Sequence, residues 1–204
     1  MKFSKRATSI AEAIVVMTVV VLGIVGMYDI YNQSTRFSDS VEHRVKAIWI
    51  AREWIEWITN MRDTNWILFS TDYKNCWNTL NYQVSCIDNT TNSTDIVTGT
   101  YIIYQDTDNR WKLQTRPTYL NYLNTTTRNN YKVGYDTNWN YAQSTRISTN
   151  TQPLFTRRVV VSYDWWNSDK MLVDVIVEWM DSSSEWVKQV TLNTRLNNWK
   201  NKKF

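Results

Sequence analysis

Residues 8–28 read Thr8-Ser-Ile-Ala-Glu-Ala-Ile-Val-Val-Met-Thr-Val-Val-Val-Leu-Gly-Ile-Val-Gly-Met-Tyr28, and this stretch decides the fold. Of the 22 residues between Arg6 and Asp29, only Glu12 is charged. A helix of this length measures roughly 33 Å, which is enough to cross the hydrocarbon core of a bilayer. A carboxylate inside such a span costs about 2.5–3.5 kcal/mol, so Glu12 is a candidate functional residue.

Basic residues precede this span and orient it. Lys2, Lys5 and Arg6 favour a cytoplasmic N-terminus, with the rest of the chain on the far side of the membrane. Three interpretations compete. A cleaved secretory signal peptide is disfavoured because the apolar run is long and no small-x-small site follows it. A plain single-pass anchor leaves Glu12 unexplained, and the third interpretation is a short leader that is removed.

A resemblance to a known family supports the third interpretation, a short leader that is removed. The N-terminus resembles that of type IV pilins and pseudopilins, in which a short basic leader ends in a small residue and the mature apolar helix carries Glu as its fifth residue. Here the leader is Met1–Ala7, cleavage falls between Ala7 and Thr8, and the fifth mature residue is Glu12. The chain departs from the usual pattern by having Ala7 in place of Gly and Thr8 in place of Phe.

The resemblance implies a structural subunit that assembles from the membrane. A prepilin peptidase would cut after Ala7 and methylate the new amine of Thr8, and Glu12 would pair with the Thr8 amine of a neighbouring subunit. An assembly ATPase and a membrane platform protein are further partners by family analogy. The subunit would span the cytoplasmic membrane once before assembly, and lie afterwards in a cell-surface filament or its periplasmic equivalent. A membrane-anchored adhesin that never polymerises is the alternative, and an exported enzyme is a third hypothesis.

The resemblance also implies an α+β fold, a long helix packed on an antiparallel sheet. We expect a leader at 1–7, a membrane or filament-core half of the helix at 8–28, an amphipathic half at 29–62 and a β-rich head at 63–204. The amphipathic half is indicated by apolar residues at helical spacing, namely Val41, Val45, Ile48, Ala51, Ile55 and Ile58. Trp57 is expected on the charged side, and Asp63–Asn65 is the predicted helix stop.

Five stretches of the head have strand character. They are residues 101–105, 110–115, 155–163, 171–180 and 186–193. Short turn-like spacers join the last three, which favours an antiparallel meander. The face carrying Val173, Val175, Val177 and Trp179 is expected to pack on the helix, with Asp174 and Glu178 on the outer face. The rest of the Asn- and Thr-rich segment 88–152 shows weak periodicity and is expected to form loops.

The remaining chemistry-bearing residues are few. Cys76 and Cys86 are the only cysteines, and in an exported head they suggest a disulfide that closes a short loop. His43 is the single histidine, so neither a zinc site nor a Ser–His–Asp triad has support, and we expect a protein that is not an enzyme and needs no cofactor. The net charge is +4, but the only dense basic group is Lys200, Lys202 and Lys203, so no basic patch supports a nucleic-acid site. Nucleic acid is expected as a partner only if the filament takes up DNA.

Glycine and tryptophan occur in unusual numbers. The chain has 4 Gly and 12 Trp, and average usage predicts about 14 Gly. Trp165, Trp166 and Trp186 stand between strand-like runs, where turn chemistry favours Gly. We therefore hypothesise that some of these residues are encoded by UGA in a genetic code that reads UGA as Gly. A protein that is truly rich in Trp is the alternative, and UGG codons at Trp165 and Trp166 would establish it.

Overall fold

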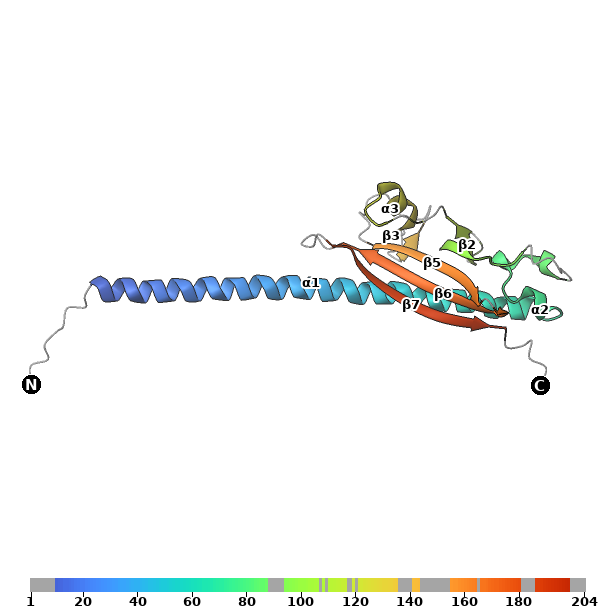
Figure 1. Ribbon diagram of the computed structural model, residues 1–204, viewed down its shortest axis with the longest axis horizontal. Coiled ribbons are helices and arrows are strands. Elements are labelled where there is room, and N and C mark those ends of the chain that lie inside the picture. Colours follow the sequence, from blue (N-terminus) through green and yellow to red (C-terminus); the bar gives the residue numbers. More distant parts are fainter. Residues whose placement is uncertain are drawn as a thin grey trace, which may run out of the picture. The chain divides into compact units, whose positions relative to one another are not determined.

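The structure is a computed structural model that describes residues 10–87, 94–106, 108, 110–116, 119, 121–135, 141–143, 155–164, 166–180 and 186–198. The chain divides into two compact units, residues 1–43 and 44–204, and helix α1 (Ile10–Leu68) begins in the first and ends in the second. A long N-terminal helix and an antiparallel sheet confirm the predicted α+β class (Figure 1).

Helix α1 extends further than the sequence predicts. It runs for 59 residues and ends at Leu68, so the predicted stop at Asp63–Asn65 is wrong. Tertiary contacts hold the additional turn. Asn65 is buried, and its side-chain Nδ2 donates hydrogen bonds to the backbone oxygens of Trp77 at 3.3 Å and Thr79 at 3.1 Å. The short polar residues that suggest a helix end therefore serve as anchors for the following loop.

The buried face of α1 within the head is rotated from the predicted stripe. The most buried residues of this face are at most 2% exposed and are Ala47, Ile50, Ala51, Trp54, Ile58 and Met61. Val41 and Val45 are 44% and 45% exposed, so they do not belong to this face. Trp57 does not lie on a solvated side either, because its ring lies 3.7 Å from that of Trp111 on strand β2.

Within the residues that the structure describes, the sheet of the head has seven strands, and every strand pair is antiparallel. The strands are β1 (Gly99–Gln105), β2 (Trp111–Thr115), β3 (Lys132–Tyr135), β4 (Tyr141–Gln143), β5 (Phe155–Asp164), β6 (Asn167–Trp179) and β7 (Lys188–Asn197). The order is β2-β1-β5-β3-β4, and β6 pairs with both β5 and β7. The predicted β1–β2 hairpin and the β5–β6–β7 meander are confirmed.

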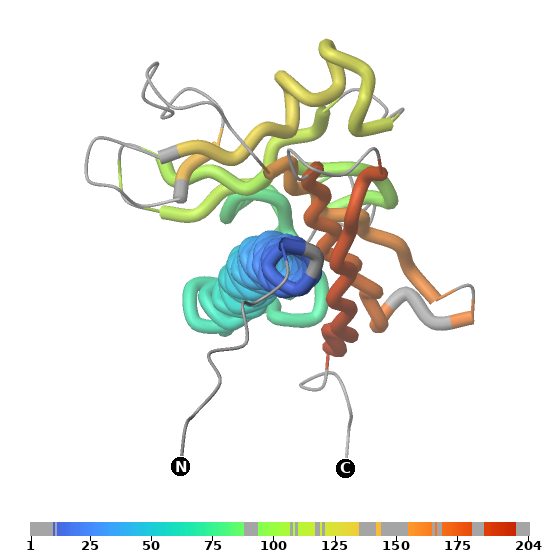
Figure 2. Tube along the Cα trace, turned by 90° about the vertical axis from the view of Figure 1, so that its left-hand side faces the viewer, coloured from blue at the N-terminus to red at the C-terminus, as the bar shows by residue number. Residues whose placement is uncertain are grey.

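The core of the head lies between α1 and the sheet. Val173, Val175 and Val177 are fully buried, Trp179 is 2% exposed, and all four belong to the same cluster as the buried residues of α1. The prediction that this face of β6 packs on the helix is therefore confirmed. Figures 1 and 2 show strands β5–β7 running beside the C-terminal part of α1.

Short elements fill the segments between the long ones. After α1 come α2 (Tyr73–Cys76) and two 3-10 turns, η1 (Leu80–Tyr82) and η2 (Val84–Cys86). Helix α3 (Thr125–Tyr131) and strands β3 and β4 occupy part of the segment that was expected to be loop, so that expectation is wrong there. The Asn124 side chain caps α3 by accepting a hydrogen bond from the backbone N–H of Thr127 at 2.9 Å. Residues 88–93, 136–140 and 144–154 lie outside the described part of the chain.

Candidate functional site

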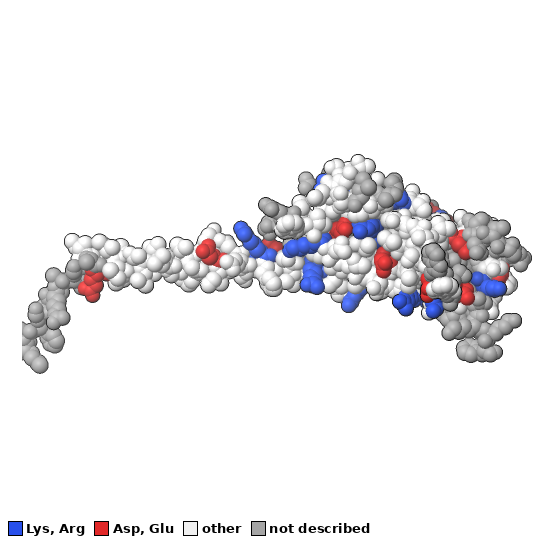
Figure 3. Space-filling model, in the orientation of Figure 1, with Lys and Arg blue, Asp and Glu red and all other residues white. Residues whose placement is uncertain are grey.

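The N-terminal part of α1 is the first candidate site. Within the described residues α1 is the one helix long and apolar enough to cross a bilayer, and an 18-residue window of it has a mean hydropathy of 2.3 with no residue buried. Its large apolar side chains up to Tyr31 are more than half exposed. Figure 3 shows few charged side chains along this part of α1 on the face in view.

Polar groups in this segment are few, and the helix satisfies one of them. The hydroxyl of Thr18 donates to the backbone oxygen of Ile14 at 2.8 Å, so it adds little to the cost of burying the segment in lipid. A Cβ built on Gly23 or Gly26 would meet no atom within 4 Å. These two positions therefore leave room for close approach by another helix.

Glu12 lies in the first turn of α1 and is exposed. A carboxylate at a helix N-terminus is favoured by the backbone dipole by about 0.3–1 kcal/mol at an aqueous surface. This gain is smaller than the cost of the same charge in a bilayer core, about 2.5–3.5 kcal/mol. An isolated Glu12 carboxylate is therefore costly if the segment enters lipid, and a cationic partner would offset that cost. Its predicted partner Thr8 and the predicted cleavage residue Ala7 lie outside the described residues.

Cys76 and Cys86 form a disulfide, as the sequence suggests. Both cysteines are fully buried, and Phe69, just after the end of α1, packs against them. Asn81, inside the closed loop, has a φ of 55° and exchanges two hydrogen bonds with the backbone of Leu113 on β2. Asn tolerates the left-handed region better than most residues, which allows this contact. The disulfide loop is thus fixed to an edge strand of the sheet.

Arg157 links the sheet to α1 within the head. Its guanidinium Nη1 donates to the backbone oxygen of Ile50 at 3.2 Å and forms an ion pair with Glu53 at 3.0 Å. The same guanidinium lies 3.7 Å from the ring centroid of Trp54. Arg157 is 2% exposed, and these contacts help to compensate its charge for the loss of water.

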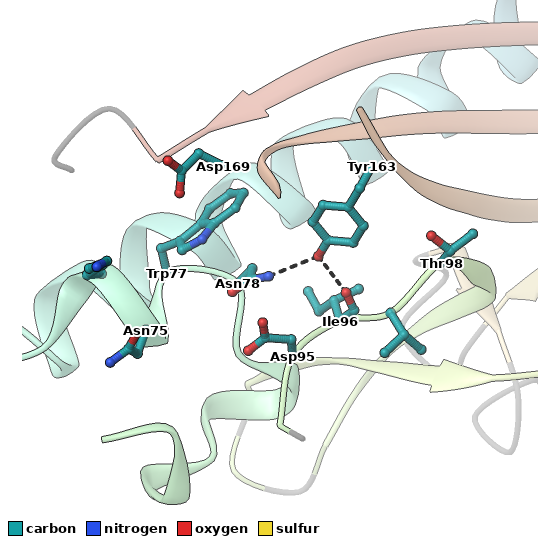
Figure 4. Close-up of a pocket in the computed structure, with 10 residues that line it drawn as sticks. Asn75, Trp77, Asn78, Asp95, Ile96, Thr98, Tyr163 and Asp169 are labelled. Atoms are coloured by element: carbon teal, nitrogen blue, oxygen red, sulfur yellow. Dashed lines mark hydrogen bonds between the residues drawn. The ribbon is translucent and has the colours of Figure 1, made fainter. Parts of the chain in front are cut away.

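A polar pocket of about 400 Å³ is the second candidate site, and sequence analysis did not anticipate it. Four segments build it: α2 with the residues after it, residues 95–98, the end of β5 and the start of β6 (Figure 4). The charged side chains in its wall are Lys74, Asp95 and Asp169, and the aromatic ones are Trp77 and Tyr163. Such a set of residues from separate segments leaves no local sequence signal.

A hydrogen-bond network fixes one wall of this pocket. Asn78 Nδ2 donates to the Tyr163 hydroxyl at 3.0 Å, and that hydroxyl donates to the backbone oxygen of Ile96. The Asn78 side chain also hydrogen-bonds Asp95. Burial nevertheless raises the pKa of Asp95 to about 6, because desolvation outweighs this hydrogen bond. Desolvation likewise raises the pKa of Tyr163, so the phenol stays neutral.

The outer face of β6 holds a second polar cluster, around Glu178. This residue lies on the outer face, as expected, but it is only 7% exposed. Arg158 of β5 forms an ion pair with Glu178 at 3.0 Å, and the hydroxyl of Tyr119 donates to the same carboxylate. Burial raises the pKa of Glu178 to about 7. The ion pair with Arg158 by itself favours the charged carboxylate. Among the described residues, no group of three or more His, Cys, Asp or Glu could hold a metal ion.

Comparison of the chain with protein-family models, curated proteins and solved structures gave no significant match. The architecture itself is pilin-like, since a long apolar N-terminal helix continues into a helix half that packs on a C-terminal antiparallel sheet.

Proposed function

We propose that this chain is a non-enzymatic structural subunit of a type IV pilus or of a related secretion or DNA-uptake filament. The observation that carries the proposal is the single helix α1, which joins an exposed apolar segment to a helix half built into the head. A cleaved signal peptide would contribute nothing to the folded head. In this chain, by contrast, the helix that supplies the membrane-length segment also supplies part of the core of the head.

Glu12 is the assembly residue in this proposal. Removal of the leader Met1–Ala7 by a prepilin peptidase creates a cationic amine at Thr8, and Glu12 of one subunit pairs with the Thr8 amine of the next. Pairing offsets the cost of an isolated charge in lipid, which favours subunits that sit at one axial stagger. The exposed apolar side chains then exchange lipid for the equally apolar helices of neighbouring subunits. An assembly ATPase and a platform protein would drive this transfer.

Mass spectrometry of the mature N-terminus tests the processing step. An N-methylated Thr8 is expected, and retention of Met1 would overturn the proposal. Glu12→Gln tests the charge pair. Membrane insertion should persist by carbonate extraction, whereas the yield of sheared filaments should fall to background.

The matched control is Asp29→Asn, because Asp29 is exposed on the same helix beyond the apolar span. This variant should assemble normally. Normal filament yield from Glu12→Gln, with the leader removed, would show that the charge pair does not direct assembly.

A membrane-anchored binding module that never polymerises is the second candidate. The polar pocket of the head favours it, because a pure scaffold has no need of convergent polar groups. Retention of the leader by a chain that binds a ligand through its head would support this alternative.

A further inference from the structure

The pocket of the head has the properties of a ligand site rather than of a packing defect. Its volume of about 400 Å³ lies in the range of small-molecule pockets. Polar side chains from separate segments converge on it, whereas genuinely empty cavities in proteins are apolar.

The charges of the pocket select the sign of the ligand. Asp95 and Asp169 are half-buried carboxylates, whereas Lys74 is exposed and therefore largely solvated. An anion would meet two carboxylates, whereas a cation offsets the desolvated charge of Asp95 directly.

The donors and the rings narrow the kind of cation. Mg²⁺ and Ca²⁺ take six or more oxygen ligands, and no cluster of three acidic residues exists among the described residues. The Tyr163 hydroxyl is engaged with Asn78 and with the Ile96 backbone, so Tyr163 offers its ring rather than a donor. Aromatic rings beside carboxylates suit an alkylammonium group, whose methylenes and charge both find partners there.

The walls of the pocket are fixed before any ligand arrives. The backbone N–H of Ile96 donates to the backbone oxygen of Asn78 at 2.9 Å, and the backbone N–H of Leu80 donates to the backbone oxygen of Thr94 at 2.7 Å. A β-bridge joins Thr79 to Asp95. Binding therefore requires little ordering of the protein, which favours affinity for a small ligand.

We propose that this pocket binds a primary ammonium group on an unbranched alkyl stem, with Asp95 and Asp169 as its charged partners and the rings of Trp77 and Tyr163 beside its methylenes. The stem belongs either to a lysine side chain of a partner or to a free diamine. The proposal is independent of filament assembly, because every residue in it lies in the head.

The test is a titration of the full chain in lipid nanodiscs, followed by ligand-observed NMR. The probe is Nα-acetyl-lysine methylamide, with Nα-acetyl-norleucine methylamide as the uncharged analogue and 1,5-diaminopentane as the free amine. The lysine probe should bind and the norleucine probe should not. Tighter binding of the diamine than of the lysine probe would identify a free amine as the ligand, and the reverse order a lysine side chain.

Asp95→Asn keeps the size of the side chain and its ability to accept from Asn78, but removes the charge. It should weaken binding of the lysine probe about tenfold or more, as expected for loss of a charge-assisted hydrogen bond. Asp169→Asn should also weaken binding, and it carries the test if Asp95→Asn fails to fold. The control is Asp174→Asn, which lies on the same strand as Asp169 but outside the pocket wall. The proposal would be overturned if the norleucine probe bound as tightly as the lysine probe, or if Asp95→Asn and Asp169→Asn both kept wild-type affinity for the lysine probe.

Discussion

Stability of the head should fall as the pH rises from about 4.5 to about 7, and Glu178 contributes to this fall. Its carboxylate is 7% exposed on the outer face of β6, where it contacts Arg158 and Tyr119. Burial raises its pKa from 4.5 to about 7 in the folded protein. Between these values the folded state holds a proton that the unfolded state has already lost, so stability decreases with increasing pH.

The size of the effect follows from the two pKa values. At about 1.4 kcal/mol for each tenfold change in proton affinity, a rise from 4.5 to about 7 corresponds to roughly 3 kcal/mol. This value is an upper limit, because the ion pair at 3.0 Å with Arg158 favours the charged carboxylate. Burial of Asp95 gives a contribution of the same sign, because the pKa of Asp95 is also raised. The contribution of Glu178 must therefore be isolated by substitution.

Urea denaturation of the full chain in non-ionic detergent, followed by near-UV circular dichroism, measures the effect. Glu178→Gln keeps an acceptor for Arg158 and Tyr119 but cannot ionise, so its stability should vary less with pH than that of the wild type. Glu56→Gln, an exposed carboxylate of α1, should retain the wild-type dependence. An identical pH dependence for the wild type and Glu178→Gln, or a rise in stability with pH, would refute the reasoning.

Four further variants test the packing of the head in the same denaturation assay. Replacing Cys76 and Cys86 by Ser should cost about 3 kcal/mol, because the bridge closes a short loop, and reducing the wild type should cost as much. Ile58→Ala should cost about 2–5 kcal/mol because Ile58 is 1% exposed. Ile67→Ala on the same helix should cost less than about 0.5 kcal/mol because Ile67 is 76% exposed, and equal losses would contradict the observed face of α1. Trp166→Gly should change stability by less than about 0.5 kcal/mol, since Trp166 is 91% exposed.

Elements with a strong local pattern could be predicted from the sequence. Val173, Val175 and Val177 alternate with residues that include Asp174 and Glu178, and this pattern marks β6 and its buried face because side chains of a strand alternate between two sides. Long helices without Pro are equally clear, which is why α1 was expected over most of its length. Its end was not, because Asn65 makes contacts with residues 77 and 79 that local propensity does not encode.

Other elements depend on contacts that no local pattern reveals. Helix α3 contains Thr125, Thr126 and Thr127, and β-branched residues are poor helix formers, so the segment was expected to be loop. The cap by Asn124 and burial of Thr127 and Tyr131 override that propensity. Both the pocket and the Glu178 cluster combine residues that lie far apart in the chain.

The tryptophans lie in two kinds of environment that bear on the codon hypothesis differently. Trp166 and Trp186 are 91% and 78% exposed beside strand connections, so glycine there would remove little buried surface. Trp54 and Trp57 have buried Nε1 donors with no hydrogen-bond partner among the described residues, which is unusual because buried indole N–H groups normally have one. Glycine at Trp54 would remove the ring under Arg157 and leave its bond to the helix backbone at Ile50. Glycine at the exposed positions therefore leaves the fold unchanged, whereas glycine at Trp54 requires the Arg157 side chain to repack against α1. The codon at each position decides whether the residue is Trp or Gly.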